Sequence, residues 1–331
     1  MSDIKPILGR HSSLKLSNFN DRDLQTSMAE AQTDYIKHLG QYANSAVEEM
    51  ENGFSLDGIP LPWGKTNQDI TLPLKYISIL AGSSGQKKTT LSVLQILHSS
   101  KSHKVGFASF EMRVNYLTKM MAAMKAGVSE KSVTTQCVRD FCQYATNRIY
   151  CYDQIGDVSA MRVLGAVEAL GQLGCKLVVV DSLMMVDLYA KSGQEEFSKQ
   201  RDFVSALSGL AAIHDMHVML VAHNRKPGEY QSDGRPNKNS VRGSSGITDV
   251  AAVVLLCHQD EKKQKLLQDV EKYGETLSEA DQKYVDRTPC QRLIVAKNRF
   301  NSFQGTIALY QHSRSRQLLG DRSDRAMNLE L

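Results

Sequence analysis

The chain has 331 residues, of which 41% are hydrophobic, so it is long enough for one large domain with an appendage or for two modest domains. This composition excludes wholesale disorder. The net charge of +4 and the pI near 8.6 are too small to produce a polyanion-binding field over the whole protein. Any contact with nucleic acid therefore has to come from local basic patches.

Cysteine spacing and hydropathy exclude two further classes of protein. The six cysteines contain no C-x-x-C pair, which predicts reduced thiols rather than a disulfide framework or a zinc module. No stretch approaches the ~20 apolar residues of a membrane-spanning helix, and the chain does not begin with an apolar signal segment. We therefore expect no membrane partner and a cytoplasmic location.

The N-terminal region is expected to form an arm and one helix. Residues 1–20 are polar and aperiodic, whereas apolar residues recur at helical spacing over 21–51. Glycine and proline between 53 and 62 end this pattern. We expect an arm and linker helix over 1–60, with the helix packing either on a neighbouring subunit or on its own domain, and a main domain over 61–331.

Strand-like and helix-like segments alternate through the main domain. Strands are expected at residues 76–81, 105–110, 148–152, 177–180, 218–222, 250–257 and 292–296, with a hairpin over 305–317. Helices are expected at 89–99, 114–126, 159–173 and 200–214. Strands of continuous Val, Ile and Leu between helices predict an α/β fold, with a mainly parallel sheet covered on both faces. The densely charged segment 260–287 resembles a surface helical insertion.

A phosphate-binding loop follows the first of these strands. The template G-x-x-x-x-G-K-[ST] between a strand and a helix is matched, except at one position, by Gly82, Ser83, Ser84, Gly85, Gln86, Lys87, Lys88 and Thr89, with Thr90 next in the helix. Backbone N–H groups of such a loop face a phosphate chain. Lys88 would neutralise the outer phosphates of ATP, and Thr89 would ligate Mg²⁺.

Lys87 is the departure, because it stands where the template has its second glycine. A side chain at this position either disfavours the backbone conformation that glycine adopts or adds positive charge near the nucleotide. The sequence thus predicts nucleotide binding more firmly than efficient hydrolysis.

Polar residues end three of the predicted strands. Asp181 follows four apolar residues and would hold Mg²⁺, while Glu111 would act as general base toward the attacking water. His223 ends a third strand and could contact the γ-phosphate. Because ligands gather at the carboxyl ends of parallel strands, we expect these side chains to lie together.

Two basic segments complete the candidate site. A long polar loop and its flanks would track single-stranded DNA through Arg225, Lys226, Arg235, Lys238 and Arg242, with Tyr230 available to stack on a base; a solvated loop is the alternative. Lys297 and Arg299 follow a late strand, and in a ring of subunits they could reach a neighbour's ATP, with Arg299 as an arginine finger.

In this order the segments resemble the helicase domain of DnaB-type replicative helicases and the related Twinkle and phage primase-helicases. The resemblance covers about residues 74–318 and is carried by GSSGQKKTT, GFASFEM, LVVVDSLMMV, LVAHNRK, VRGSSGITDVAAVVLL and LIVAKNRFNSFQG. It implies a RecA-like P-loop ATPase core and a homohexameric ring around single-stranded DNA that uses ATP and Mg²⁺ at subunit interfaces. It also implies a separate primase or loader as partner, and a host cytoplasm or an organelle matrix as location.

The resemblance assigns roles to the same residues. It implies that Lys88, Thr89, Asp181 and Glu111 serve nucleotide and magnesium, that His223 is the polar sensor, and that Lys297 and Arg299 are a trans-acting basic pair. Lys87 and the insertion depart from the family pattern, and neither an N-terminal collar nor a primase module is recognisable. Two other functions stay open: a nucleotide- and DNA-binding ring with weak hydrolysis that acts as loader or scaffold, and a RecA/RadA-like recombination ATPase.

Overall fold

The computed structural model describes residues 39–44, 47–48, 58–188, 193–225, 235–243, 245–274, 276–301 and 303–326. The chain divides into two compact units, Met1–Ser55 and Leu56–Leu331. In the first unit the described residues include a short 3-10 helix, η2 (Leu39–Tyr42). Most of the helix predicted over 21–51 lies outside the described residues, so it stays a prediction.

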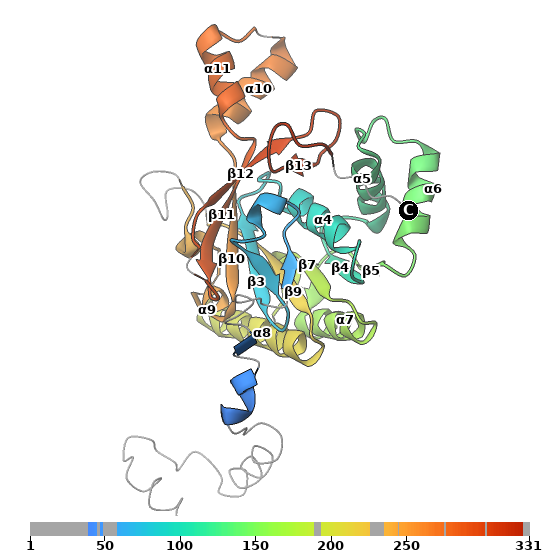
Figure 1. The fold of residues 1–331 in the computed structure, drawn as a ribbon, viewed down its shortest axis with the longest axis vertical. Helices are drawn as coiled ribbons and strands as arrows, with labels where there is room; N and C mark the ends of the chain where they lie inside the picture. The colour runs from blue at the N-terminus through green and yellow to red at the C-terminus, as the bar shows by residue number, and fades with distance from the viewer. Residues whose placement is uncertain are drawn as a thin grey trace, which may run out of the picture. The chain divides into compact units, whose positions relative to one another are not determined.

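The second unit is built on a nine-stranded sheet with the order β13-β12-β11-β10-β3-β9-β7-β4-β5 (Figure 1). The strands are β3 (Ile77–Gly82), β4 (Val105–Ser109), β5 (Ile149–Asp153), β7 (Leu177–Asp181), β9 (His217–His223), β10 (Val253–His258), β11 (Gln291–Asn298), β12 (Thr306–Gln311) and β13 (Leu318–Leu319). From β10 to β5 all neighbours are parallel, whereas β11, β12 and β13 add an antiparallel edge. The predicted mainly parallel sheet is confirmed.

Helices cover both faces of the sheet because its central strands are apolar on both sides. All five residues of β7 are buried. One face packs against α4 (Lys88–Ser99), α5 (Val114–Ala126) and α6 (Thr135–Ala145). The other face packs against α7 (Ala160–Gln172), α8 (Gly193–Ile213) and α9 (Ser245–Val250) (Figure 1). Among the described helices, none is both long enough and apolar enough to cross a membrane.

Some elements are absent from the sequence predictions. Helix α6 was not among the predicted helices, although its apolar residues recur at helical spacing and it buries Phe141 and Tyr144. Helix α9 takes up Val250, where a strand was expected to begin, and β10 instead starts at Val253. Two short sheets also went unpredicted because their strands have two or three residues: β1 (Gly58–Pro60) with β2 (Thr71–Pro73), and β6 (Val158–Ser159) with β8 (Val186–Asp187).

The charged insertion forms a helical hairpin, as its sequence suggested. Its helices are α10 (Glu261–Tyr273) and α11 (Glu279–Arg287), which lie between β10 and β11 and project from the sheet (Figure 1). Each helix has a polar N-cap, because the side chains of Asp260 and Ser278 accept backbone N–H groups of the first turn.

A neutral histidine lies inside the sheet at the start of β9. His217 is fully buried; its Nδ1 donates to the Pro73 carbonyl at 2.7 Å, so its Nε2 accepts from the Ser78 hydroxyl at 2.7 Å. Burial lowers the pKa of His217 to about 4. Since the unfolded chain protonates this ring near pH 6.5, the unfolded state gains a proton that the folded state cannot accept.

We therefore expect the free energy of unfolding to fall as the pH is lowered from about 6.5 to about 4, by roughly 3 kcal/mol from this residue. Urea unfolding of the wild type and of His217→Gln at several pH values in this window checks the expectation. Glutamine keeps a donor and an acceptor but does not titrate, so the variant should show a shallower pH dependence. Parallel curves for the two proteins would assign the acid sensitivity to other groups.

Candidate nucleotide-binding site

The phosphate loop joins the end of β3 to the start of α4, as predicted. Gly82 lies so close to β10 that a Cβ at this position would meet Cys257 Cβ at 2.9 Å, so only glycine fits without displacement. Lys88 is buried, and its Nζ donates to the Ser83 carbonyl at 3.1 Å, which closes the loop on itself. Burial lowers the pKa of Lys88, while Cys257, Asp181 and Glu111 oppose that shift.

Lys87 adopts the conformation that glycine would supply. Its backbone has φ 58° and ψ 28°, the left-handed region, where an ordinary side chain costs about 1–2 kcal/mol. The Lys87 Nζ donates to Gln311 Oε1 on β12 at 2.7 Å. Burial is the main cause that lowers the Lys87 pKa, and the nearby Arg316 and Lys263 lower it further. The departure from the template therefore leaves a left-handed backbone here and ties the side chain to β12.

Thr89 and Asp181 form a pair beneath the loop. The Thr89 hydroxyl donates to Asp181 Oδ2 at 2.9 Å, and Asp181 is 1% exposed. Burial raises the pKa of Asp181 to about 6, with Thr89 opposing the shift. A buried carboxylate next to a hydroxyl is the hard-oxygen donor set that suits Mg²⁺, an ion that takes its other ligands from water and phosphate.

Glu111 lies two residues beyond β4 and is held by two neighbours. Its Oε1 accepts from the Ser182 hydroxyl at 2.5 Å and lies 3.5 Å from His223 Nε2. The hydrogen bond from His223 is the largest cause that lowers the pKa of Glu111 to about 2, although burial opposes it. Glu111 is therefore ionised at neutral pH. The strand ends bring Glu111, Asp181 and His223 together as predicted.

The predicted DNA segment begins directly beyond β9, and its two ends are bonded to each other. Asn224 and Val241 form an antiparallel bridge, and the N–H of Arg242 donates to the His223 carbonyl at 2.7 Å. The Arg225 guanidinium donates to the Gly243 carbonyl at 3.1 Å. The remaining predicted DNA-contacting residues divide as follows: Arg235 and Lys238 are exposed, while Lys226, with Tyr230, lies outside the described residues.

Lys297 and Arg299 lie at the end of the sheet's strands that is opposite the phosphate loop. Strand β11 runs antiparallel to β10, so Arg292 faces His258 near the phosphate loop, whereas Asn298 faces Val253 at the far end. Six residues of extended chain separate these ends by roughly 20 Å. The structure therefore does not bring Lys297 and Arg299 to the phosphate loop of their own chain.

These two cations are held in place by one helix end. Lys297 Nζ donates to the carbonyls of Thr248 and Asp249 at 2.8 Å and 2.9 Å, and Arg299 donates to Asp249 at 2.5 Å. Cations near the carboxyl end of a helix satisfy its free carbonyls. Helix α9 thus orients both side chains at the edge of the domain.

Sequence reasoning missed Ser182, Gln311 and Gln259. Ser182 follows Asp181 directly, so its position beside the site was visible in the sequence, but its bond to Glu111 was not. Gln311 and Gln259 contact the phosphate loop from 224 and 173 residues away, and no local pattern indicates such contacts.

Comparisons with known proteins agree with this geometry. The family model of the DnaB-like helicase C terminal domain matches residues 72–318. Among solved structures, the "ATPase Domain of G40P" is similar with a TM-score of 0.66 and 15% identity, covering 89% of this chain and 100% of that one. "The Structure Of A DnaB-Like Replicative Helicase And Its Interactions With Primase" is similar with a TM-score of 0.65 and 16% identity, covering 93% and 72%.

No curated protein sequence matches the chain significantly. At 15–16% identity the two structural matches show the fold alone, which is the RecA-like ATPase fold of DnaB-like helicases. The family match is independent of them and spans more than half of the sequence. On that match, the chain belongs to the DnaB-like helicase family through its C-terminal domain.

Proposed function

We propose that this protein is an ATP-driven DNA helicase that translocates on single-stranded DNA as a ring. The observation that carries the proposal is that two sets of charged side chains lie at opposite ends of the strands of one sheet. Lys88, Asp181 and Glu111 lie at the phosphate-loop end, and Lys297 and Arg299 lie at the other. The second pair can act on ATP only if another copy of the chain presents it.

Each side chain at the phosphate-loop end would have its own role in phosphoryl transfer. Lys88 would bind the β- and γ-phosphates of ATP, and residues 82–87, with Thr90 at the start of α4, would surround the phosphate chain with backbone N–H groups. Thr89 and Asp181 would hold Mg²⁺, which when bound supplies positive charge that stabilises the leaving group. Glu111 would orient the attacking water and accept its proton.

His223 would link ATP hydrolysis to DNA. Its ring contacts Glu111, and its carbonyl accepts the N–H of Arg242 at the base of the predicted DNA loop. A change in the position of His223 therefore reaches the catalytic carboxylate and the loop through one residue. Binding of the phosphodiester backbone, independent of sequence and sensitive to salt, would fall to the basic residues of this segment: Arg225, Lys226, Arg235, Lys238 and Arg242.

The partners follow from the same proposal. Single-stranded DNA is the track, further copies of the chain complete each ATP site, and a separate primase or loader would bind the assembled ring. The direct test is unwinding of a forked DNA duplex at increasing protein concentration, with ATP and with a non-hydrolysable ATP analogue. We expect strand displacement only with ATP, together with DNA-stimulated ATP turnover. Absence of both at concentrations where rings form would contradict the proposal.

The second candidate arises from Lys87 at the place of the template glycine: a ring that binds ATP and DNA but hydrolyses ATP slowly and serves as loader or scaffold. Because Lys87 already has the left-handed conformation, we expect Lys87→Gly to change kcat less than about threefold. Steady-state ATPase assays with DNA check this, and Lys87→Ala is the matched control because it removes the ammonium but keeps a Cβ. Turnover that is undetectable in the wild type and restored by glycine would favour the scaffold. Strand exchange without strand displacement would favour a recombination ATPase.

A further inference from the structure

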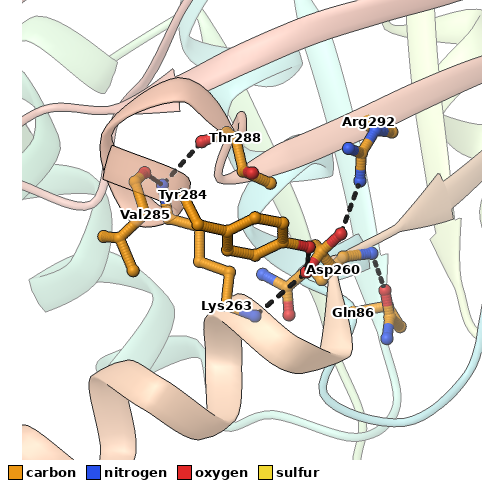
Figure 2. Close-up of polar contacts among 8 residues, drawn as sticks. Gln86, Asp260, Lys263, Tyr284, Val285, Thr288 and Arg292 are labelled. Atoms are coloured by element: carbon orange, nitrogen blue, oxygen red, sulfur yellow. Dashed lines mark hydrogen bonds and ion pairs between the residues drawn. The ribbon is translucent and has the colours of Figure 1, made fainter. Parts of the chain in front are cut away.

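The root of the α10–α11 hairpin, residues 259–263 and 284–292, lies against the phosphate loop. β10 pairs with β3 so that Leu256 faces Ala81, and both strands end at the same edge. At that edge the Gln86 side-chain oxygen accepts the backbone N–H of Gln259, the residue just before the N-cap of α10 (Figure 2). Gln86 belongs to the loop that would surround the phosphates, so one hydrogen bond joins that loop to the insertion.

The root itself is cross-bonded in several directions, as Figure 2 shows. Asp260 accepts the N–H of Lys263 at 2.9 Å and the Tyr284 hydroxyl at 2.7 Å, and its other oxygen lies 3.5 Å from Arg292. These partners belong to α10, α11 and β11. A displacement at residue 259 is therefore passed to both helices and to the neighbouring strand.

A buried lysine joins the two helices at the root. Lys263 is 5% exposed, and its Nζ donates to the carbonyls of Val285 and Thr288 at 2.7 Å and 2.6 Å, which fixes the last turn of α11 to the first turn of α10. Breaking such a buried charged bond is costly, so Lys263 holds the two helix ends together.

Gln259 has a hydrogen-bonding capacity that the present arrangement does not use. The residue is 5% exposed, and its Nε2 is buried with no partner among the described residues. A buried donor without a partner is unfavourable by about the energy of its lost hydration. A small rearrangement at the root can therefore gain a hydrogen bond for Gln259.

We propose that Gln86 is a positioning residue through which nucleotide binding in the phosphate loop and the conformation of the hairpin root are coupled. The inference rests on the proposed function, since it assigns ATP to the loop. Gln86 acts through Gln259, and the hairpin serves as a reporter of the nucleotide state on the surface of the domain. Coupling of this kind is reciprocal: anything that binds the hairpin changes the affinity of the loop for ATP, by the same factor by which ATP changes its affinity for the hairpin.

The test measures amide hydrogen exchange by mass spectrometry in the full chain, with and without a non-hydrolysable ATP analogue and Mg²⁺. We expect nucleotide to slow exchange in residues 259–264 and 284–291 of the wild type. Gln86→Met keeps the length of the side chain but removes the acceptor, so the hairpin response should disappear. Nucleotide affinity, measured with a fluorescent ATP analogue, should fall about 3- to 10-fold, the effect of one hydrogen bond.

Two further variants separate coupling from general damage. Tyr284→Phe removes a hydrogen bond to Asp260 at the root without touching the phosphate loop, and it should also weaken the hairpin response. Gln282→Met is the matched control, because Gln282 is exposed and donates to Asp286 within α11, away from the root contacts; it should behave as the wild type.

The outcomes distinguish the two proposals. Nucleotide binding without any change of exchange in the hairpin would overturn the coupling and leave the ATP site standing, as would an unaltered hairpin response in Gln86→Met. A wild type that fails to bind the nucleotide would overturn the proposed function and the coupling together.

Discussion

Replacing Arg299 with alanine is expected to lower kcat for ATP hydrolysis by about 10³-fold or more, which is the usual contribution of an arginine that contacts the transferred phosphoryl group. ATP binding should be much less affected, because the phosphate loop of the same chain stays intact. The reason is geometric: Arg299 lies at the end of the sheet's strands that is opposite its own loop, bonded to the carbonyl of Asp249. Steady-state ATPase and equilibrium nucleotide binding give the two quantities separately.

Mixing two inactive variants makes this prediction specific for action between subunits. Rings mixed from Arg299→Ala and Lys88→Ala subunits contain some interfaces with an intact loop on one side and an intact arginine on the other. Turnover should therefore reappear on mixing, at a fraction of the wild-type value. Arg314→Ala, which changes an exposed arginine elsewhere, should keep wild-type turnover. Failure of mixing to restore any activity would argue against a trans role for Arg299.

Replacing Glu111 with glutamine is expected to lower kcat by about 10²- to 10⁴-fold, the usual contribution of a positioned general base. The amide oxygen can still accept from Ser182, so the local structure and nucleotide binding should persist. Single-turnover hydrolysis compared with nucleotide affinity measures this difference. Since the pKa of Glu111 is lowered to about 2, its protonation should not reduce turnover between pH 5 and pH 8.

Ser182→Ala provides the control for Glu111. It removes one of the two groups that hold the carboxylate but leaves the base, so a much smaller loss of kcat is expected. If Glu111→Gln kept kcat within about tenfold of the wild type, the base would have to be sought elsewhere, because that loss is below the range for general-base catalysis.

The sheet and the positions of the strand-end residues follow from local sequence. The apolar run at residues 177–180 is buried on both faces, and a continuous run of this kind is by itself typical of a strand in a parallel sheet. Because parallel strands end at one edge, Asp181 was expected near the loop that contains Thr89. Helix α6 was not predicted, although its apolar residues recur at helical spacing around the buried Phe141 and Tyr144.

The contacts of the phosphate loop with distant segments depend instead on how the strands are placed beside one another in the folded chain. Lys87 was recognisable as a departure, and its left-handed backbone follows from its place in the template, but its bond to Gln311 depends on where β12 ends. The bond between Gln86 and Gln259 likewise exists because β10 stops beside β3. Sequence patterns describe faces and periods of single elements, and they do not say which side chains meet across 173 or 224 residues.

The direction of β11 also has a consequence for symmetry. One end of β11 lies near the phosphate loop, and Lys297 and Arg299 lie at its other end. If Arg299 completes a neighbour's site, the contact is heterologous, with unlike patches meeting head to tail. A head-to-tail chain of subunits that stays open leaves the ATP site at one end incomplete. Only a closed cycle fills every site, so specific activity should rise steeply with protein concentration and then level off once the cycle closes.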